Sequence, residues 1–403
     1  MNESRGSLRI LAVGNLYPPH YAAGYELMWQ AAMRRARSLG HQVRVLATDY
    51  RAGTGPAETD PDVHRTLRWY WDIERYRFHD LSPWQRMQLE RHNARELNRH
   101  LREFEPDVVA WWSMGCMSLS LIELVRRRGI PAVSVVHDDW LVYGQEHDHW
   151  SRMWRKRPRL APVAERCLRM PTVVDAANGG HFVFNSRYTL EAARRAGASL
   201  PSATVVYPGI EERFRAALPR EPWRWRLLSL GRIDRQKGVD TAVRALAHLP
   251  AEATLTVWGT GDPGYVGEME ALARDLGLGD RVRFAGWADA EEVMSAYEMA
   301  DAVVFPPCWE EPFGLVPIEA MGLGRPVVTT ARGGSAEFLR DGENALVFEA
   351  DDAEGLAGAV TRLAEDEALR ERLLRGGQET ASRYTLEHFA DRTVQEIVGA
   401  VRP

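Results

Sequence analysis

The sequence of 403 residues has few cysteines: Cys116, Cys167 and Cys308, far apart and odd in number. Such a set provides neither a disulfide framework nor the paired spacing of a zinc site. Long hydrophobic runs are missing too, because the most apolar stretch, residues 108–122, is interrupted by serine and glycine. It is shorter than the roughly 18–20 residues of a membrane-spanning helix. The first residues have no secretory-signal pattern, so we expect a cytoplasmic protein.

A strong excess of positive charge is also missing, since 51 Lys and Arg residues stand against 56 Asp and Glu residues, with a net charge of −5. This balance argues against a protein that wraps nucleic acid. Lysine itself is scarce, and Lys156 and Lys237 are the only two. In contrast, 45% of the residues are hydrophobic, enough for a sizeable core, and the length favours two domains.

Short apolar runs alternate with helix-period stretches in two consecutive series, a pattern typical of parallel sheets covered by helices. The first series predicts strands at 8–13, 43–47, 107–110, 132–136, 182–185 and 204–207, with helices at 25–39, 118–128 and 188–196. The second predicts strands at 227–230, 254–258, 282–285, 302–305 and 327–330, with helices at 239–249, 266–276, 291–299 and 316–321. We take residues 208–222 as a linker and expect helices after Asp351, interrupted at Gly376-Gly377.

The predicted fold class is therefore α/β, with two Rossmann-like, doubly wound parallel-sheet domains that face each other across a cleft. We place the first domain at residues 1–208, the second at 209–385, and a C-terminal helix in 386–403. Doubly wound sheets bind ligands at the carboxyl ends of their strands, so function is expected at those ends.

Glu311 and Glu319 bracket a predicted helix start, because Pro317 suits the first turn of a helix. The free amides there belong to Gly314, Leu315 and Val316. Together with the helix dipole they favour a phosphate. Carboxylates would repel a phosphate, so we expect the two glutamates to accept hydrogen bonds from hydroxyls on either side. A solvated surface helix is the alternative, while a glycosidase pair is disfavoured because eight helical positions span roughly 12 Å.

The loop after the predicted strand 227–230 carries two cations, Arg232 and Lys237, between Gly231 and Gly238. Such a pair can neutralise a leaving diphosphate without a metal. The scarcity of lysine suggests that a compact ammonium is needed at Lys237, although an ordinary basic loop remains the alternative.

Gly259 and Gly261 belong to a G-x-G-x-x-G sequence that follows a predicted strand, as in dinucleotide-binding proteins. The next strand, 282–285, does not end in an acidic residue that could hold a ribose, which disfavours a nicotinamide or flavin site. We interpret the two glycines, and also Gly333-Gly334, as places where the backbone approaches a nucleotide.

In the first domain, Ala23-Gly24 lies between a strand and a helix, as a close-approach loop or a plain tight turn. His137 ends the strand 132–136, where it can contact a substrate hydroxyl or a developing charge; a structural histidine is the alternative. His147 and His149 suggest a metal, but no further ligands are evident and we predict none.

Basic and aromatic residues alternate in the segment Trp150–Arg159. This composition predicts either peripheral contact with the inner membrane face through Arg152–Arg159, or a grip on an acceptor. Aromatic faces stack on sugars, which makes Trp69, Trp71 and Trp140 candidate acceptor contacts. An exposed helix without such a role is the alternative.

Taken together, these motifs resemble the retaining GT-B glycosyltransferases of family 4, also called glycosyl transferases group 1, over nearly the whole chain. The residues that carry the resemblance are Pro18-Pro19, Ala23-Gly24, His137, Phe184–Ser186, Tyr207–Ile210, Gly231-Arg232, Lys237-Gly238, Gly259, Gly261, Glu311–Glu319 and Gly333-Gly334 with Glu337. The chain departs from the family pattern at Ala23, at Cys308 and in a longer, more aromatic arm at 140–178.

The resemblance implies transfer of a sugar from a nucleotide diphosphate donor to a hydroxyl acceptor, with retention of configuration and without metal or other cofactor. It implies that Arg232 and Lys237 hold the diphosphate, that Glu319 holds the ribose and that Glu311 holds the donor sugar. The implied neighbours of phosphate and sugar are the amides of Phe313, Gly314, Leu315 and Val316, with Gly24 at the phosphate and His137 beside the reacting sugar. It further implies same-face attack, in which the leaving phosphate takes the acceptor's proton, and a last helix that crosses back to the first domain.

We therefore predict a hexosyltransferase whose catalytic residues are His137, Arg232, Lys237 and Glu311, with the donor on the second domain and the acceptor on the first. A sugar-nucleotide epimerase or phosphorylase of the same fold, and a non-catalytic nucleotide-sugar binding protein, are the alternatives.

Overall fold

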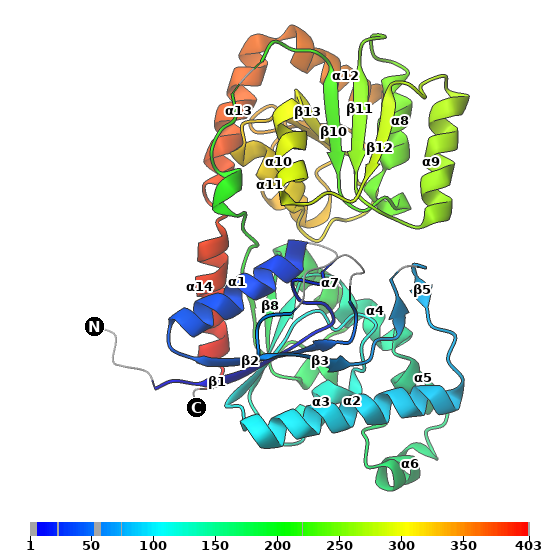
Figure 1. Ribbon diagram of the computed structural model, residues 1–403, viewed down its shortest axis with the longest axis vertical. Coiled ribbons are helices and arrows are strands. Elements are labelled where there is room, and N and C mark those ends of the chain that lie inside the picture. Colours follow the sequence, from blue (N-terminus) through cyan, green and yellow to red (C-terminus); the bar gives the residue numbers. More distant parts are fainter. Residues whose placement is uncertain (1–5, 22–23, 52–57, 74, 220, 402–403) are drawn as a thin grey trace. The chain divides into compact units, whose positions relative to one another are not determined.

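The computed structural model in Figure 1 describes residues 6–21, 24–51, 58–73, 75–219 and 221–401. The chain separates into two compact units: residues 1–207 with 387–403, and residues 208–386. Each contains one large parallel β-sheet with helices, so the predicted fold class is confirmed.

The first unit is built on a seven-stranded sheet of order β3-β2-β1-β6-β7-β8-β9, in which every pair is parallel. Its strands are β1 (Arg9–Val13), β2 (Gln42–Thr48), β3 (Val63–Leu67), β6 (Val108–Trp111), β7 (Ala132–Val136), β8 (His181–Phe184) and β9 (Ala203–Val205). Its helices are α1 (Gly24–Ser38), α2 (Pro83–Phe104), α3 (Ser120–Arg126), α4 (Trp140–His147), α5 (His149–Arg155), α6 (Ala161–Leu168), α7 (Arg187–Arg195) and α14 (Leu386–Gly399). A short antiparallel pair, β4 (Trp71–Asp72) and β5 (Arg77–Phe78), precedes α2.

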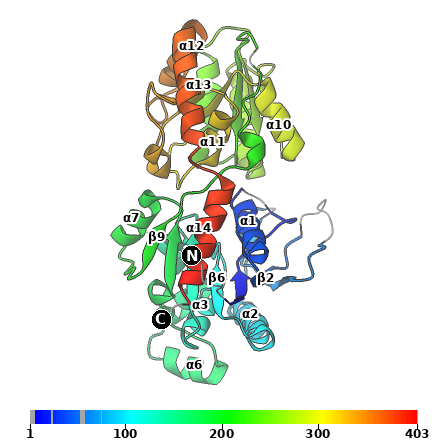
Figure 2. The ribbon, with the colours of Figure 1, turned by 90° about the vertical axis from the view of Figure 1, so that its left-hand side faces the viewer.

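The helix α14 returns the end of the chain to the first unit, where Figure 2 shows it beside α1. Its Phe389 and Ile397 are fully buried, and Asp391 forms an ion pair of 2.5 Å with Arg35 of α1. Apolar burial rather than the exposed ion pair holds this helix in place.

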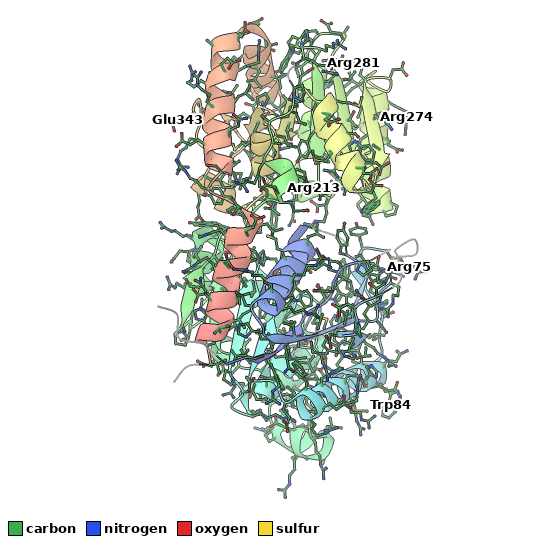
Figure 3. The ribbon with its side chains drawn as sticks, turned by 60° about the vertical axis from the view of Figure 1, so that its left-hand side comes forward. Arg75, Trp84, Arg213, Arg274, Arg281 and Glu343 are labelled. Atoms are coloured by element: carbon green, nitrogen blue, oxygen red, sulfur yellow. The ribbon has the colours of Figure 1, made fainter. Side chains whose placement is uncertain are left out.

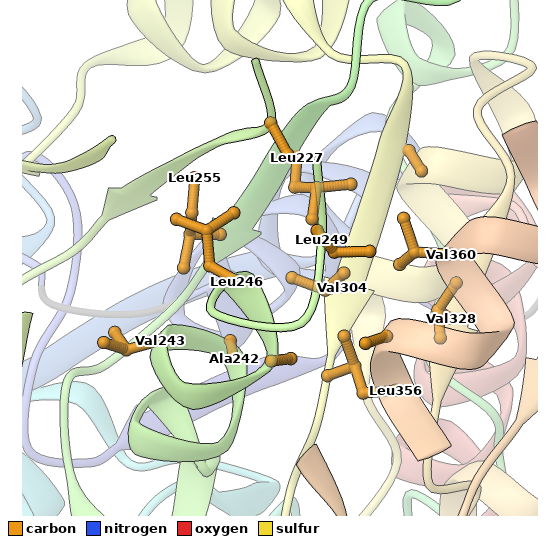
Figure 4. Packing of buried hydrophobic residues seen from close by; sticks show 14 of the residues in the cluster. Leu227, Ala242, Val243, Leu246, Leu249, Leu255, Val304, Val328, Leu356 and Val360 are labelled. Atoms are coloured by element: carbon orange, nitrogen blue, oxygen red, sulfur yellow. The ribbon is translucent and has the colours of Figure 1, made fainter. Parts of the chain in front are cut away.

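The second unit has a six-stranded parallel sheet of order β12-β11-β10-β13-β14-β15. Its strands are β10 (Arg226–Leu230), β11 (Thr254–Trp258), β12 (Val282–Gly286), β13 (Ala302–Phe305), β14 (Val327–Thr329) and β15 (Leu346–Val347). Its helices are α8 (Val239–Leu246), α9 (Pro263–Asp275), α10 (Ala290–Met299), α11 (Leu315–Gly322), α12 (Ala353–Glu365) and α13 (Glu367–Ala381). Figure 4 shows how buried residues of the sheet, such as Leu255 and Val304, pack against Leu246 of α8 and Leu356 of α12.

The first part of the predicted linker at 208–222 packs on the second unit, whereas residues 215–217, 219, 221 and 222 are exposed. Ile210 pairs with Thr385, and Phe214, in the short 3-10 helix η2 (Glu212–Phe214), is 3% exposed. These two apolar side chains need cover from water, which a free linker would not give them.

The predicted interruption at Gly376-Gly377 is wrong, because α13 runs through both glycines. A Cβ on Gly376 would lie 2.2 Å from the carbonyl oxygen of Glu343. One on Gly377 would lie 3.0 Å from the side chain of Met321 in α11. The glycines therefore allow α13 to approach its neighbours closely, and they do not end it.

Candidate functional site

The two central strands of the second sheet, β10 and β13, mark the point where its strand order reverses. Numbered within the unit, the order is 3-2-1-4-5-6, and ligands of such sheets bind at the carboxyl ends of the strands at this reversal. The loop 231–238 follows β10, and the loop 306–314 follows β13. These two loops carry the predicted cations and the predicted carboxylate Glu311.

Glycines bring the neighbouring loops into backbone contact. Gly259 has φ +143°, and a Cβ there would lie 1.7 Å from the carbonyl oxygen of Gly231. A Cβ on Gly261 would lie 1.9 Å from the carbonyl oxygen of Ile233. The two glycines thus support the loop that carries Arg232, and their direct contact with a nucleotide stays a prediction.

Lys237 and Glu311 meet directly, with 2.6 Å between Nζ and Oε2. The indole N–H of Trp309 donates a hydrogen bond of 2.9 Å to the same Oε2. The ammonium also lies 5.6 Å from the ring centroids of Phe305 and Trp309, a cation–π arrangement. Because the two side chains are only 17% and 9% exposed, the pair is fixed and shielded from water. An ammonium has three N–H donors, so binding to Glu311 does not exhaust its donors.

The helix α11 begins next to this pair, and its predicted start is confirmed. Gly314 is the N-cap with φ +91°, and no side chain caps the helix there. The first amides of the helix, those of Leu315 and Val316, therefore combine with the helix dipole as an anion-binding group. The Phe313 side chain is buried against Phe338 and Tyr384, so only its backbone could meet a ligand.

Glu319 lies further along α11 and is held by Tyr297 of α10. The Tyr297 hydroxyl, on a fully buried ring, donates a hydrogen bond of 2.9 Å to Oε2 of Glu319. Burial raises the pKa of the Glu319 carboxyl to about 7, although the Tyr297 hydrogen bond and the charge of Arg213 act in the opposite direction. The hydrogen bond from Tyr297 fixes one oxygen of the Glu319 carboxyl group. When ionised, this carboxylate can accept hydrogen bonds from the hydroxyls of a ligand.

Arg232 lies on the rim of the site with its side chain 50% exposed, and its Nη2 is 3.3 Å from Asp234 Oδ2. Asp234 also accepts hydrogen bonds from the backbone N–H groups of Gln236 and Lys237. Sequence reasoning missed Asp234, Trp309 and Tyr297. An Asp three residues before Lys237 is a turn signal that could have been found, whereas no pattern links Tyr297 to Glu319.

In the first unit, His137 follows β7 and lies among aromatic rings. Ring centroids of Tyr25, Trp112 and Phe389 are 6.1, 6.2 and 5.6 Å from its own. Burial lowers its pKa to about 3, so the imidazole is neutral near pH 7. Its Nε2 has no hydrogen-bond partner among the residues that the structure describes. The ring is neutral and its Nε2 is itself buried, so its contact with a substrate hydroxyl stays a prediction.

Gly24 is the exposed first residue of α1, and Ala23 lies outside the described residues. The adjoining strand end carries Asn15, which donates to Ser113 Oγ at 3.2 Å and accepts from the Tyr25 hydroxyl. These contacts join the loops after β1 and β6, the reversal point of the first sheet.

The three tryptophans proposed for the acceptor differ in accessibility. Trp140 is 0% exposed within the core of its unit, so its assignment as an acceptor contact is wrong: a covered ring offers no face to a sugar. Trp69 is half-buried and donates to the Gly115 carbonyl at 3.2 Å, and Trp71 packs edge-on against Phe78. For these two the acceptor role stays a prediction.

Two properties of the described part of the chain bear on ligands and membranes. Across those residues, no three His, Cys, Asp or Glu side chains come together as metal ligands. None of the helices described there is both long and apolar enough to cross a bilayer.

Two doubly wound parallel-sheet units are the architecture of the GT-B class of folds, and solved glycosyltransferase structures share it. The family model "Glycosyltransferase Family 4" matches residues 23–214, and "Glycosyl transferases group 1" matches residues 210–380. The two matches together span most of the sequence, and the chain belongs to glycosyltransferase family 4.

Among curated proteins, the lipopolysaccharide core biosynthesis glycosyltransferase LpsE of Rhizobium meliloti is 38% identical over 42% of this chain and 48% of its own. The D-inositol 3-phosphate glycosyltransferase of Xylanimonas cellulosilytica is 35% identical over 48% of this chain and 50% of its own. The chain thus spans about half the length of the curated relatives it matches. Among solved structures, Anabaena Alr3699/HepE in complex with UDP and glucose has a TM-score of 0.71 at 19% identity, covering 97% of this chain and 99% of its own.

Proposed function

We propose that this protein transfers a hexose-type sugar from a nucleotide diphosphate sugar to a hydroxyl acceptor, with retention of configuration and without a metal. The observation that carries the proposal is the Lys237–Glu311 pair beside the start of α11, at the reversal point of the second sheet. The similar HepE structure contains UDP and glucose, which supports a donor of this class.

In the proposed complex, the α11 amides of Gly314, Leu315 and Val316 bind the diphosphate together with Lys237 and Arg232. The cations and the helix dipole stabilise the charge that grows on the leaving phosphate, the task that a metal performs in other transferases. Glu319 accepts from the ribose hydroxyls. Glu311 accepts from the donor sugar and orients Lys237.

In the reaction, the bond from the anomeric carbon to the phosphate oxygen breaks, and a bond to the acceptor oxygen forms on the same face of the sugar. The acceptor proton passes to the leaving phosphate, so the step needs no protein nucleophile. Glu311 already binds Lys237 and Trp309, which suits an orienting group better than an attacking one. The neutral His137 is proposed as a hydrogen-bond partner of the reacting sugar.

The acceptor class is a hydroxyl of a small glycoside, a natural product or an envelope glycan or lipid precursor. The names of the LpsE and D-inositol 3-phosphate relatives support glycan and polyol acceptors. We propose cytoplasmic action, with peripheral contact to the inner membrane face in the basic segment Arg152–Arg159.

Isothermal titration calorimetry with UDP-glucose and other nucleotide sugars tests the donor site. Lys237→Ala should weaken binding about tenfold to hundredfold, since a hydrogen bond to a charged group is lost. Lys156→Ala, at the only other lysine, is the matched control and should bind normally. Because the single change leaves Glu311 without its cation, Lys237→Ala/Glu311→Gln removes both charges together. Normal affinity in both Lys237 variants would refute the donor site.

Assays of what happens to the nucleotide sugar distinguish a transferase from an epimerase and from a binding protein. A transferase releases the nucleoside diphosphate only as an acceptor is glycosylated, and proton NMR of the anomeric centre reports retention. An epimerase would convert the sugar without releasing the nucleotide, and a binding protein would do neither.

A further inference from the structure

Two acidic side chains of the first unit, Glu90 of α2 and Asp148 at the start of α5, are buried and take no part in the proposed reaction. Glu90 is 0% exposed and Asp148 is 4% exposed. The helices α2 and α5 pack against each other. We propose that the two carboxyl groups form a proton-controlled latch. While one of them holds a proton, the latch fixes α5 and the β4–β5 hairpin to α2, and when both are ionised it loosens them.

Glu90 is connected to its neighbours through hydroxyl groups. The Tyr70 hydroxyl donates to Oε1 of Glu90 at 2.8 Å, and Ser120 Oγ of α3 donates to Oε2 at 2.6 Å. The Tyr70 ring stacks on the His149 ring of α5, with centroids 5.6 Å apart and planes at 12°. His149 also contacts Phe78 of β5, with ring centroids 5.1 Å apart. Glu90 thus belongs to a network of contacts that joins α2, α3, α5 and the hairpin.

Asp148 is the N-cap of α5. Its Oδ1 accepts from the Trp150 backbone N–H at 3.4 Å, and its Oδ2 accepts from the Ser151 backbone N–H at 3.2 Å and from the Ser151 hydroxyl. Among the described residues, the hydrogen-bond donors to Asp148 and Glu90 are therefore neutral groups. Ionisation of two buried carboxyl groups that act on each other and are bonded only to neutral donors is unfavourable.

The electrostatics of the pair place its last ionisation near neutral pH. Burial and then the charge of Asp148 raise the pKa of Glu90 to about 7, although hydrogen bonds from neighbouring hydroxyls act in the opposite direction. Burial also raises the pKa of Asp148. Because the folded pKa values are raised, the contribution of the pair to stability is largest at acid pH and is lost as the pH rises through 7.

Four other titratable or charged side chains face the pair: Tyr70, Arg86, His149 and Arg155. Burial raises the pKa of the Tyr70 hydroxyl well above 10, so this group stays neutral. The charge of Arg155 lowers the pKa of Asp148 but does not cancel the effect of burial, and Arg86 acts on Tyr70. His149 is the remaining group that can titrate near neutral pH, so the experiment includes a variant of it.

Hydrogen–deuterium exchange of the full chain, read by mass spectrometry, tests the latch. It uses no donor, acceptor or turnover, so its outcome does not depend on the proposed function. The reference is Glu90→Gln, which has a similar shape and cannot ionise. Above pH 7, amides of α5 and β5 should exchange faster in the parent than in Glu90→Gln, and the excess should grow up to about tenfold per pH unit, the limit for loss of one proton. At pH 6 the excess should vanish.

Three further variants show which group is responsible. Asp148→Asn keeps a side chain that can cap α5 and should also abolish the excess. His149→Phe keeps an aromatic ring against Tyr70 and should retain it. Glu343→Gln is the matched control, because it makes the same change at an exposed carboxyl of the second unit, labelled in Figure 3, and it should behave like the parent.

Equal exchange of α5 in the parent and in Glu90→Gln at pH 8.5 would overturn the proposal, and so would loss of the excess in His149→Phe. The parent alone gives a second test, because α1 of the same unit lies outside the network and should not share the pH-dependent excess of α5. The same excess in α1 would mean that the whole unit opens, which would also overturn the latch.

Infrared spectroscopy detects the proton itself. At pH 6 the carbonyl band of protonated carboxyl groups should be weaker in Glu90→Gln/Asp148→Asn than in the parent, and at pH 9 the two should be equal. Equal bands at pH 6 would show that the parent pair is already fully ionised and would overturn the proposal.

Discussion

Lys237 shows at the scale of one residue why a compact ammonium is used where nearly every other cation is arginine. Its Nζ reaches Glu311 while lying near the faces of Phe305 and Trp309. A guanidinium is wider and planar, so it could not occupy the same point between the two rings and the carboxylate. Charge alone does not define this position, and a Lys237→Arg change would not be conservative.

Donor affinity should depend on pH through Glu319. Its pKa is about 7 in the unliganded protein, so the carboxyl gains a proton as the pH falls through 7 and loses acceptor capacity. We expect the affinity for UDP-glucose to fall between pH 8 and pH 6, by about tenfold for a loss of roughly one charge-assisted hydrogen bond. The phosphates of this donor stay ionised in that range. Calorimetry across the series measures the effect, and Glu319→Gln should show a flat profile.

The raised pKa of Glu319 also determines how the stability of the folded protein depends on pH. The folded pKa of Glu319 lies above its ordinary value of 4.5, so its contribution to the free energy of unfolding is most favourable below pH 4.5 and is lost as the pH rises through 7. Without nucleotide, Glu319→Gln should therefore melt higher than the parent at pH 8 but not at pH 5. A melting temperature unchanged at both pH values would contradict a buried, ionising Glu319.

Tyr297→Phe should change the pH profile of donor binding without removing a group that touches the donor. The Tyr297 hydroxyl lowers the pKa of Glu319, so its loss should move the affinity profile to higher pH. Tyr70→Phe is a matched control, because the Tyr70 hydroxyl donates to Glu90 at 2.8 Å in the first unit. It should leave donor binding unchanged at every pH, and a shift equal to that of Tyr297→Phe would refute the positioning role.

At the scale of elements, the apolar runs of the two central sheets predict their strands well, whether the strand is buried on both faces, as β7 and β13 are, or on one, as β11 is. The predicted bounds of β7, β11 and β13 agree with the structure at both ends. The edge strand β3 (Val63–Leu67) was missed because three consecutive polar residues, His64, Arg65 and Thr66, break the apolar–polar alternation, although Arg65 is buried between Val63 and Leu67. The same reasoning found Lys237 and Glu311 from loop position, but it could not separate a core aromatic such as Trp140 from a surface one.

The long helix α2 was missed for a different reason. Its capping box, formed by Ser82 and Gln85 with Pro83 at the first helical position, is a readable start signal. Its buried face, however, includes Glu90, Asn93 and His100 alongside leucines, which hides the helical period of apolar residues. Polar groups that find partners inside the fold are invisible to a hydrophobicity pattern.

The space around two helical glycines, Gly376 in α13 and Gly358 in α12, predicts opposite effects on stability when each is changed to alanine. Gly376→Ala should destabilise the protein by about 1–3 kcal/mol, because its Cβ would meet the Glu343 carbonyl. Gly358→Ala, in the exposed part of α12 with open space around it, should stabilise it by about 0.5–1 kcal/mol. Urea unfolding compares the two. Stabilisation by both would mean that α13 does not pack as closely as described.

At the scale of the whole molecule, the charges needed for the proposed chemistry come from the chain itself. Lys237, Arg232 and the start of α11 supply positive potential in the second unit. We therefore expect sugar transfer to proceed undiminished after exhaustive dialysis against EDTA, with radiolabelled donor as the readout.

The variant Lys237→Met tests the role of the positive charge directly, because it removes the ammonium group and keeps an apolar side chain of similar length. If positive charge at the diphosphate is what the reaction requires, the variant should lose activity by about 10²-fold or more. Magnesium should not restore it, because the unpaired Glu311 alone is a poor site for an ion that requires near-octahedral oxygen ligands. Loss of parental activity in EDTA, or rescue of Lys237→Met by magnesium, would instead place a divalent ion at the diphosphate and overturn the metal-free scheme.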